Sequence, residues 1–261
     1  MLTNKFKINY SIGSVANGIK TDSFTFFLLF FYSNIIGLNP GLAGSAIFIA
    51  LCIDAVTDPL MGTISDRTNT SLGRRHPYMM ISFIPMSLGY IFLFAPRQDW
   101  DMSQSDLFVW MTIFTVLTRI GMTLFDIPHR AFGGEVTKNY KERTILMSWR
   151  EMVGWVAGLS NAFLGYGIFF ASTPEYPQGQ LNPDAWFPFA VTGAIFMIIS
   201  VLYSSLSTKD EIKSLSKWSG SISLIDIIKE LKIAIGNRAF LIFFFGNLFL
   251  SIAWGLSNTL T

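Results

Sequence analysis

Seven long apolar segments are the feature that most restricts what this chain can fold into. Each is close to the ~20 residues that an α-helix needs to cross ~30 Å of hydrocarbon. Only 14% of the residues are charged, against roughly 25% in soluble domains. Because lipid offers the backbone no hydrogen bonds, and the sequence lacks the period-2 pattern of a β-barrel, we predict an all-α polytopic membrane protein. The predicted spans are residues 9–36, 41–64, 78–96, 106–129, 149–171, 186–206 and 239–260.

Basic residues in the connections predict how the spans are oriented. With the N-terminus inside, the Lys and Arg residues of the connections fall on the cytoplasmic side, and Arg97 is the exception. Since positively charged connections stay in the cytoplasm, we predict a cytoplasmic N-terminus in a bacterial plasma (inner) membrane. The net charge of +2 suggests no nucleic-acid partner, so the expected partners are membrane lipid and a small-molecule substrate. The sequence has no G-x-S-x-G, H-E-x-x-H or P-loop motif, and we therefore do not expect an enzyme.

Two aspartates lie inside the second apolar segment. Asp54 and Asp58 are four residues apart, so they project from one face of a helix and can share a ligand. An ionised carboxylate at the bilayer centre costs at least ~2.5 to 3.5 kcal/mol on insertion scales, so the pair needs a cation, a proton or a structural role. Hard cations prefer oxygen ligands. The pair therefore predicts a site for Na⁺ or H⁺, with a helix-stabilising pair as the alternative.

Polar residues form a stripe along the fourth span. Arg119, Thr123 and Asp126 lie at i, i+4 and i+7 and so face a common interior. Thr123 is a candidate third ligand of the cation, and Arg119 with Asp126 is either part of a substrate site or a buried structural pair. We predict that the helix breaks at Pro128 and that residues 130–148 connect it to the next span.

The first span is unusually polar for a membrane helix. Asn17 and Lys20 share one face, and Asp22 follows. Charged side chains at this depth do not face lipid, so they either line a water-filled substrate path or neutralise partners on neighbouring helices. The fifth span carries Gly154-x-x-x-Gly158, a small-residue face that predicts close helix packing.

Motifs between about Tyr10 and Arg150 carry a family resemblance. They are Asp54-Ala-x-x-Asp58-Pro59-x-x-Gly62, Gly62-x-x-x-Asp66-Arg67 with Gly73-Arg74-Arg75, and Phe125-Asp126-Ile127-Pro128-His129 with Gly134-Glu135 and Glu142-Arg143-Thr144. In combination they resemble the glycoside-pentoside-hexuronide (GPH):cation symporter family, the melibiose permease-like group of the major facilitator superfamily. The chain departs from that pattern at Gly18, where an aspartate is usual, and at Arg130, where a tryptophan is usual.

The resemblance implies the N-terminal six-helix half of a major facilitator fold plus the first helix of the second half. The expected domains are a six-helix bundle over residues 1–206, a cytoplasmic middle loop over 207–238 and a seventh helix over 239–261. Apolar residues at helical spacing between Ile222 and Ile235 predict an amphipathic helix on the membrane surface within that loop. A complete transporter would also need the missing C-terminal half.

The function implied by the resemblance is symport of a sugar or glycoside by alternating access, coupled to Na⁺ or H⁺ and with no other cofactor. One alternative is a lipid-like or other organic solute, and another is a half or fragment that transports nothing. The predicted cation ligands, which would also be the metal ligands for Na⁺, are Asp54, Asp58 and Thr123. The predicted substrate residues are Asp126, matched to the family's sugar-binding aspartate, Arg150, Lys20, Asn17, Asp22 and Arg119. The predicted cytoplasmic gate consists of Asp66, Arg67, Arg74, Arg75 and Arg143.

Overall fold

The computed structural model describes residues 2–214, 236–239, 241–242, 245–246 and 249. The chain divides into two units, residues 1–218 and 219–261, and all features below belong to the first. The predicted amphipathic helix and most of the predicted seventh span lie outside the described residues.

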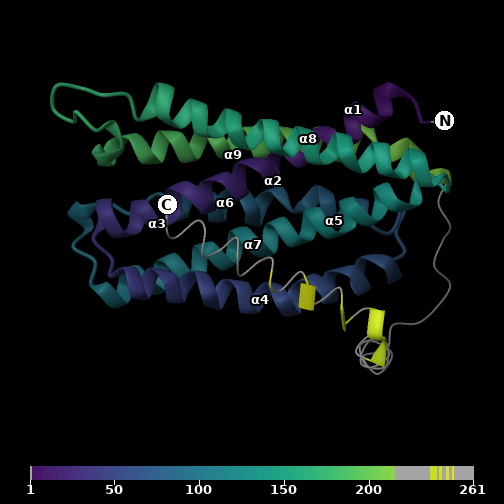
Figure 1. Ribbon diagram of the computed structural model, residues 1–261, viewed down its shortest axis with the longest axis horizontal. Helices are drawn as coiled ribbons and strands as arrows, with labels where there is room; N and C mark the ends of the chain where they lie inside the picture. Colours follow the sequence, from purple (N-terminus) through teal and green to yellow (C-terminus); the bar gives the residue numbers. More distant parts are fainter. Residues whose placement is uncertain (1, 215–235, 240, 243–244, 247–248, 250–261) are drawn as a thin grey trace. The chain divides into compact units, whose positions relative to one another are not determined.

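The described part of the first unit is helical and contains no strand (Figure 1). Its first span starts earlier than predicted and is made of several short segments, two of them π-helical. Four further spans are single long helices or nearly so, and the third is a pair of helices in line. The elements in order are α1 (Asn4–Ile12), α2 (Ser14–Asp22), η1 (Ser23–Phe27), α3 (Leu28–Phe30), η2 (Phe31–Ile36), α4 (Pro40–Arg67), α5 (His76–Ile81), α6 (Phe83–Leu93), η3 (Gln98–Trp100), α7 (Gln104–Glu135), α8 (Tyr140–Leu164), η4 (Gly165–Phe169), η5 (Gly179–Leu181), η6 (Pro183–Ala185), α9 (Trp186–Ser207) and η7 (Lys209–Ser214).

Four of these helical stretches are long and apolar enough to cross a membrane. Together with the interrupted first span and the α5–α6 pair, they make six helical spans in the described part of the chain, in the same order as the first six predicted spans. The membrane-capable stretches are Pro40–Arg67, Gln104–Glu135, Tyr140–Phe169 and Pro183–Glu211.

The predicted break at Pro128 and the predicted connection over residues 130–148 are wrong. α7 continues through Pro128 to Glu135, and α8 begins at Tyr140 after the short segment 136–139. Proline removes one backbone donor from the ladder, but α7 stays helical beyond it and ends with a bond from the Val136 amide to the Phe132 carbonyl at 3.1 Å. Asn139 caps α8 through the amides of Lys141 and Glu142.

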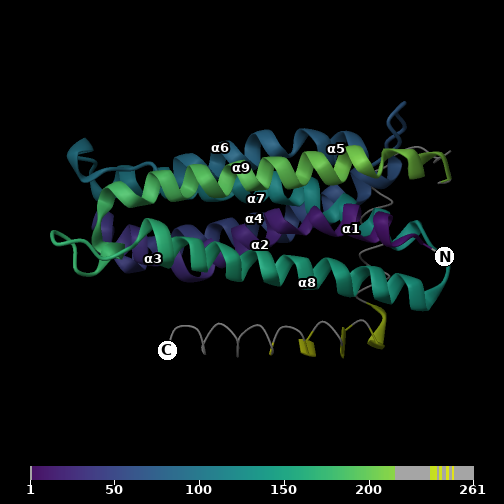
Figure 2. The same ribbon diagram turned by 90° about the horizontal axis from the view of Figure 1, so that it is seen from above.

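The helices of the bundle each pack against particular neighbours. α7 lies between α4 and α6, whereas α2 lies between α8 and α9. α6 and α9 also pack together, which joins the two groups, and Figure 2 shows these two helices side by side. Contacts between α2 and α7 are few, although both helices reach the cavity described below.

The contact between α2 and α8 passes through three glycines, Gly18, Gly154 and Gly158, which we call the glycine seam. A Cβ atom on Gly18 would lie 2.1 Å from the Gly154 carbonyl oxygen, and one on Gly158 would lie 3.2 Å from the Gly18 oxygen. The two backbones therefore touch, as small residues at helix interfaces permit. The close packing predicted from Gly154-x-x-x-Gly158 is confirmed.

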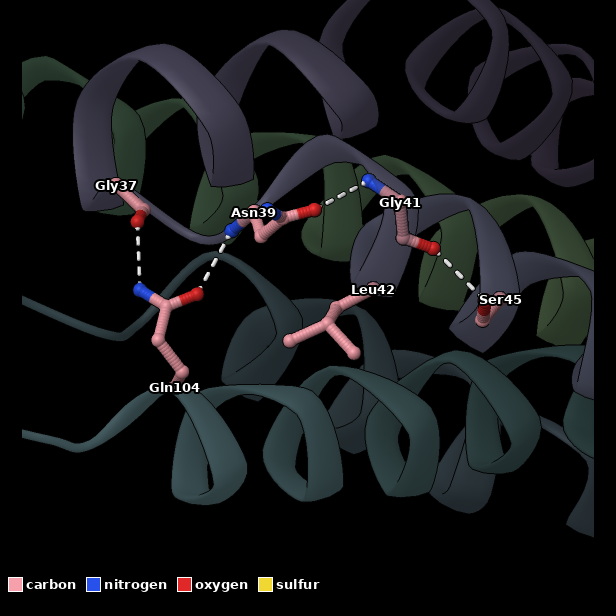
Figure 3. A pocket seen from close by; sticks show the side chains of 6 residues that line it. All are labelled: Gly37, Asn39, Gly41, Leu42, Ser45 and Gln104. Atoms are coloured by element: carbon pink, nitrogen blue, oxygen red, sulfur yellow. Dashed lines mark hydrogen bonds between the residues drawn. The ribbon is translucent and has the colours of Figure 1, made fainter.

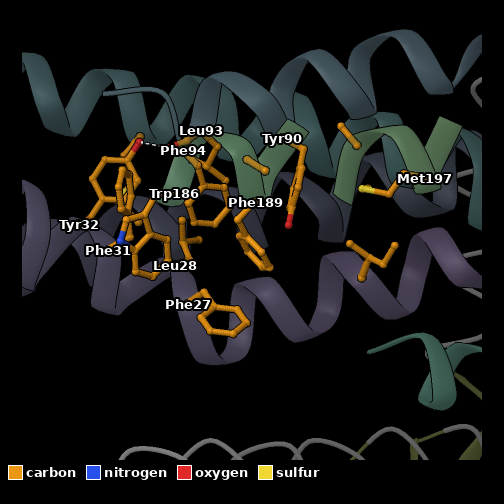
Figure 4. Packing of buried hydrophobic residues seen from close by; sticks show 14 of the residues in the cluster. Phe27, Leu28, Phe31, Tyr32, Tyr90, Leu93, Phe94, Trp186, Phe189 and Met197 are labelled. Carbon is orange, nitrogen blue, oxygen red and sulfur yellow. Dashed lines mark hydrogen bonds between the residues drawn. The ribbon is translucent and has the colours of Figure 1, made fainter. Parts of the chain in front are cut away.

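An aromatic core fills the end of the bundle where the first span is π-helical (Figure 4). Trp186 is fully buried, with its ring centroid 5.0 Å from that of Phe31 and 4.5 Å from that of Phe170. Its indole donates to the Gln180 carbonyl at 3.0 Å, which satisfies its one polar atom. This packing fixes the first span against α6 and α9.

Candidate functional site

A small cavity lies between α2, α4 and α7, and we call it the charged cavity. Its volume is about 80 Å³, enough for a few water molecules. All three predicted cation ligands and four of the six predicted substrate residues line it. The lining residues are Asn17, Lys20, Asp54, Asp58, Arg119, Met122, Thr123, Asp126 and Ile127.

Asp58 and Thr123 meet across the gap between α4 and α7. The Thr123 hydroxyl donates to Asp58 Oδ1 at 2.7 Å, and Thr123 is 6% exposed. A carboxylate beside a hydroxyl gives oxygen ligands of the kind that hard cations prefer. The structure thus brings these two predicted ligands together, and their role as ligands stays a prediction.

Asp54 has a charged neighbour. Arg119 Nη1 donates to Asp54 Oδ2 at 2.7 Å, with the two side chains 14% and 20% exposed. The other oxygen, Asp54 Oδ1, is buried and has no hydrogen-bond partner among the described residues. The alternative in which Arg119 pairs with Asp126 is wrong, because Arg119 reaches across to α4 instead of along its own helix.

Asp126 is held by two arginines. Arg130 Nε donates to Asp126 Oδ2 at 2.6 Å from one turn further along α7, and Arg150 Nη2 donates to Oδ1 from α8. Arg150 is 1% exposed and also donates to Glu151 at 2.6 Å. Arg150 does not line the cavity itself but bonds to Asp126, which does.

Sequence reasoning missed the residues that support Arg150. Arg150 Nε donates to His129 Nδ1 at 3.4 Å, and the fully buried His129 ring stacks on Tyr10 with centroids 4.1 Å apart. The spacing of His129, three residues after Asp126, was the available signal, since it places both on one face of α7. Ser14 adds a bond to the Arg150 carbonyl at 2.6 Å.

Asp22 does not line the charged cavity, and its predicted role in a substrate site stays a prediction. It is 8% exposed and accepts a hydrogen bond from Asn161 on α8 at 3.0 Å. Two residues span about 200° around a helix, which turns Asp22 away from the face that carries Lys20. Asn161 also donates to Ser23 at 3.1 Å, and Ser23 meets Tyr90 at 2.6 Å.

Four of the five predicted gate residues, Asp66, Arg67, Arg74 and Arg75, lie near the C-terminal end of α4. Arg75 Nη2 donates to Asp66 at 2.5 Å and to Glu135 at 2.9 Å, and Arg74 donates to Glu135 at 2.5 Å. Glu135, which sequence reasoning left out of the gate, thus joins α7 to this cluster. Arg67 is the last residue of α4. Arg143 is exposed and donates to the Thr137 carbonyl at 3.3 Å, outside the cluster.

A larger cavity of about 640 Å³ lies at the other end of α4 (Figure 3). Its main feature is the Gln104 side chain, which accepts from the Asn39 amide and donates to the Gly37 carbonyl, both at 2.8 Å. Gly37 has φ of 84°, a left-handed conformation that suits glycine. Gln104 thereby ties the start of α7 to the turn between the first span and α4.

Comparison with known families agrees with this architecture. Residues 9–261 match the family of MFS/sugar transport proteins. The chain belongs to this family. The match runs across the predicted seventh span, and it confirms both the resemblance to sugar transporters of the major facilitator superfamily and the fold class, an all-α membrane protein built on the N-terminal half of that fold.

Individual relatives of this MFS/sugar transport chain are named as symporters or transporters. An uncharacterized symporter, sll1374, of Synechocystis sp. is 30% identical over 78% of the chain and 37% of its own length. The isoprimeverose transporter of Lactiplantibacillus pentosus is 22% identical over 87% and 46%. The sodium-dependent lysophosphatidylcholine symporter 1-A of Danio rerio is 31% identical over 66% and 32%. The chain thus spans about a third to a half of the length of these relatives.

Proposed function

We propose that the complete gene product is a symporter that couples the uptake of a small polar solute, a sugar or glycoside, to Na⁺ or H⁺. Membership of the MFS/sugar transport family supports transport of a solute and not enzyme chemistry. The observation that carries the cation site is the position of Asp58, bonded to the Thr123 hydroxyl in the same cavity that Asp54 lines. The buried, unbonded Asp54 Oδ1 is a further ligand oxygen for the cation.

The substrate site in this proposal is the Asp126 end of the charged cavity. A carboxylate can accept two hydroxyl hydrogen bonds from a sugar, and such charge-assisted bonds are about twice as strong as neutral ones. Asn17 and Lys20 on α2 face the same space. The described cavity is too small for a sugar. The proposal therefore requires that the cavity widen in the conformation that binds the substrate.

Coupling follows from the shared position of the two sites. Thr123 on α7 is hydrogen-bonded to Asp58 of the proposed cation site. Asp126 of the proposed substrate site lies three residues after Thr123 on the same helix. A cation that neutralises Asp58 favours the arrangement of α4 against α7 that binds it, and substrate binds the same arrangement through Asp126. Linkage then requires that substrate raise the cation affinity by the same factor.

The proposal places the N-terminus and the Asp66–Arg75–Glu135 cluster on the cytoplasmic side of a bacterial plasma membrane. Its support is the distribution of Lys and Arg in the connections. The cluster would then close the cytoplasmic end by pairing charges between α4, α5 and α7. Arg143, which bonds elsewhere, would take part only in another conformation.

The test is uptake by the complete gene product in liposomes, across a panel of sugars with either a Na⁺ or an H⁺ gradient. Wild type is expected to accumulate one solute in a cation-dependent way, and Asp58→Asn is expected to lose the cation stimulation while inserting normally. Asp99→Asn, a change at an exposed aspartate, is the matched control. Undiminished stimulation in Asp58→Asn would remove Asp58 from the cation site.

A lipid-like solute is the second candidate. The zebrafish relative that is named for lysophosphatidylcholine is 31% identical over 66% of this chain, against 30% over 78% for the Synechocystis symporter. Parallel uptake of labelled sugars and labelled lysolipids by the same liposomes decides between them. Lysolipid uptake without sugar uptake would replace the sugar proposal.

A further inference from the structure

An arginine lies inside the proposed cation site. Arg119 contacts Asp54 at 2.7 Å, and both side chains are largely shielded from solvent. The contact is therefore screened much less than a surface ion pair. Asp58, by contrast, is bonded to the neutral hydroxyl of Thr123. The two carboxylates thus have unequal neighbours.

Arg119 is not engaged by the proposed substrate residue. Asp126 is bonded to Arg130 and Arg150, while Arg119 Nε is buried and has no hydrogen-bond partner in the described part of the chain. The guanidinium also lies over the Phe24 ring, 5.7 Å from its centroid. Its one carboxylate partner among the described residues is therefore Asp54.

The net charge of these three side chains matches one monovalent cation. Asp54 and Asp58 contribute two negative charges and Arg119 one positive charge, which leaves a net charge of −1. One monovalent cation neutralises this set, whereas without Arg119 the set would carry −2. The other charged groups that line the cavity are Lys20 and Asp126. The ammonium of Lys20 lies over Phe24 at 5.9 Å and has no carboxylate within salt-bridge distance among the described residues, so it acts on the site from further away.

We propose that Arg119 is a tethered cation that sets the affinity and stoichiometry of the cation site. It occupies one face of Asp54, so the site binds a single monovalent cation and releases it readily during the transport cycle. This inference rests on the proposed symport. It adds a residue that sets the affinity for the coupling ion without being its ligand. It holds whether the coupling ion is Na⁺ or H⁺.

The experiment is a cation titration of the purified complete gene product. Protein tryptophan fluorescence and the thermal unfolding midpoint are followed against NaCl, LiCl and pH, and uptake is measured against the same cations. In Arg119→Gln the half-saturating concentration of the coupling cation is expected to fall about tenfold, because a positive charge a few ångströms away has been removed. Arg119→Lys keeps the charge and is expected to stay within about threefold of wild type.

A gain in affinity separates this role from a structural one, since a disrupted site would bind the cation more weakly. An unchanged or higher half-saturating concentration in Arg119→Gln overturns the inference. Arg119→Leu also removes the charge and serves in its place if the glutamine variant does not fold, with the same expectation and the same overturning result. A wild-type protein without any cation dependence would instead overturn the proposed symport.

Discussion

The helix pairs α2–α8 and α4–α7 are held together by different kinds of contact. At the glycine seam, the backbones of α2 and α8 are in direct contact, with no space for a Cβ atom on Gly18. Between α4 and α7, a Cβ atom on Gly62 would lie at an ordinary 3.7 Å from the Ile127 side chain, and polar and charged side chains from both helices line a cavity. The first pair is in direct backbone contact, whereas the second is joined across a cavity by the Arg119–Asp54 ion pair and the Thr123–Asp58 hydrogen bond.

The difference explains where function can reside in this bundle. A backbone contact leaves no room for a ligand or for sliding, because protein interiors do not deform continuously. Ion pairs and hydroxyl bonds can exchange partners with an ion or a solute. The charged cavity is therefore the place for binding, whereas the glycine seam and the aromatic core around Trp186 hold the remaining helices in fixed positions.

The largest expected effect comes from breaking the seam. Gly18→Ala would place a methyl group 2.1 Å from the Gly154 oxygen, and such overpacking is expected to lower the free energy of unfolding by about 3 kcal/mol. The measurement is the thermal unfolding midpoint in detergent.

Gly154→Ala is the matched control for the seam, because its Cβ atom would lie 3.5 Å from the Ser14 carbonyl oxygen, an ordinary van der Waals contact. Its unfolding midpoint is expected to remain close to that of wild type. Equal losses in the two variants would show that the seam is not closed at Gly18 as described.

A smaller effect is expected from the substrate end of the charged cavity. Asp126→Asn removes one charge from the bonds to Arg130 and Arg150 and is expected to weaken substrate binding about tenfold, since hydrogen bonds to charged groups contribute about 1.5 to 3 kcal/mol. Direct binding titration measures it. Unchanged affinity would remove Asp126 from the substrate site and leave the cavity to the cation alone.

The smallest effect is expected at the cation end. Thr123→Val removes the hydroxyl that meets Asp58 and is expected to raise the half-saturating cation concentration about fivefold, which corresponds to about 1 kcal/mol. Thr123→Ser keeps the hydroxyl and is the control. If valine and serine behaved alike in the cation titration, the contact across α4 and α7 would have no part in cation binding.

Sequence reasoning found most of the charged cavity because helical periodicity alone decides which residues share a face. Asp54 with Asp58, and Arg119 with Thr123 and Asp126, follow from spacings of three and four residues. It failed where the partner lies on another helix. The contact of Asp22 with Asn161 was not predicted, and Glu135 and His129 were not assigned to the clusters that they complete.

The sequence by itself determined that the chain forms membrane helices and the approximate positions of the first six, since these depend on hydrophobic length. It also predicted which acids lie within the apolar segments, where burying a charge is costly. Only the tertiary structure decided which charges pair. Arg119 had one acid on its own stripe and another on α4, and the packing of α4 against α7 selected Asp54. Pairing of this kind depends on the distance between helices, which the periodicity of a single helix does not contain.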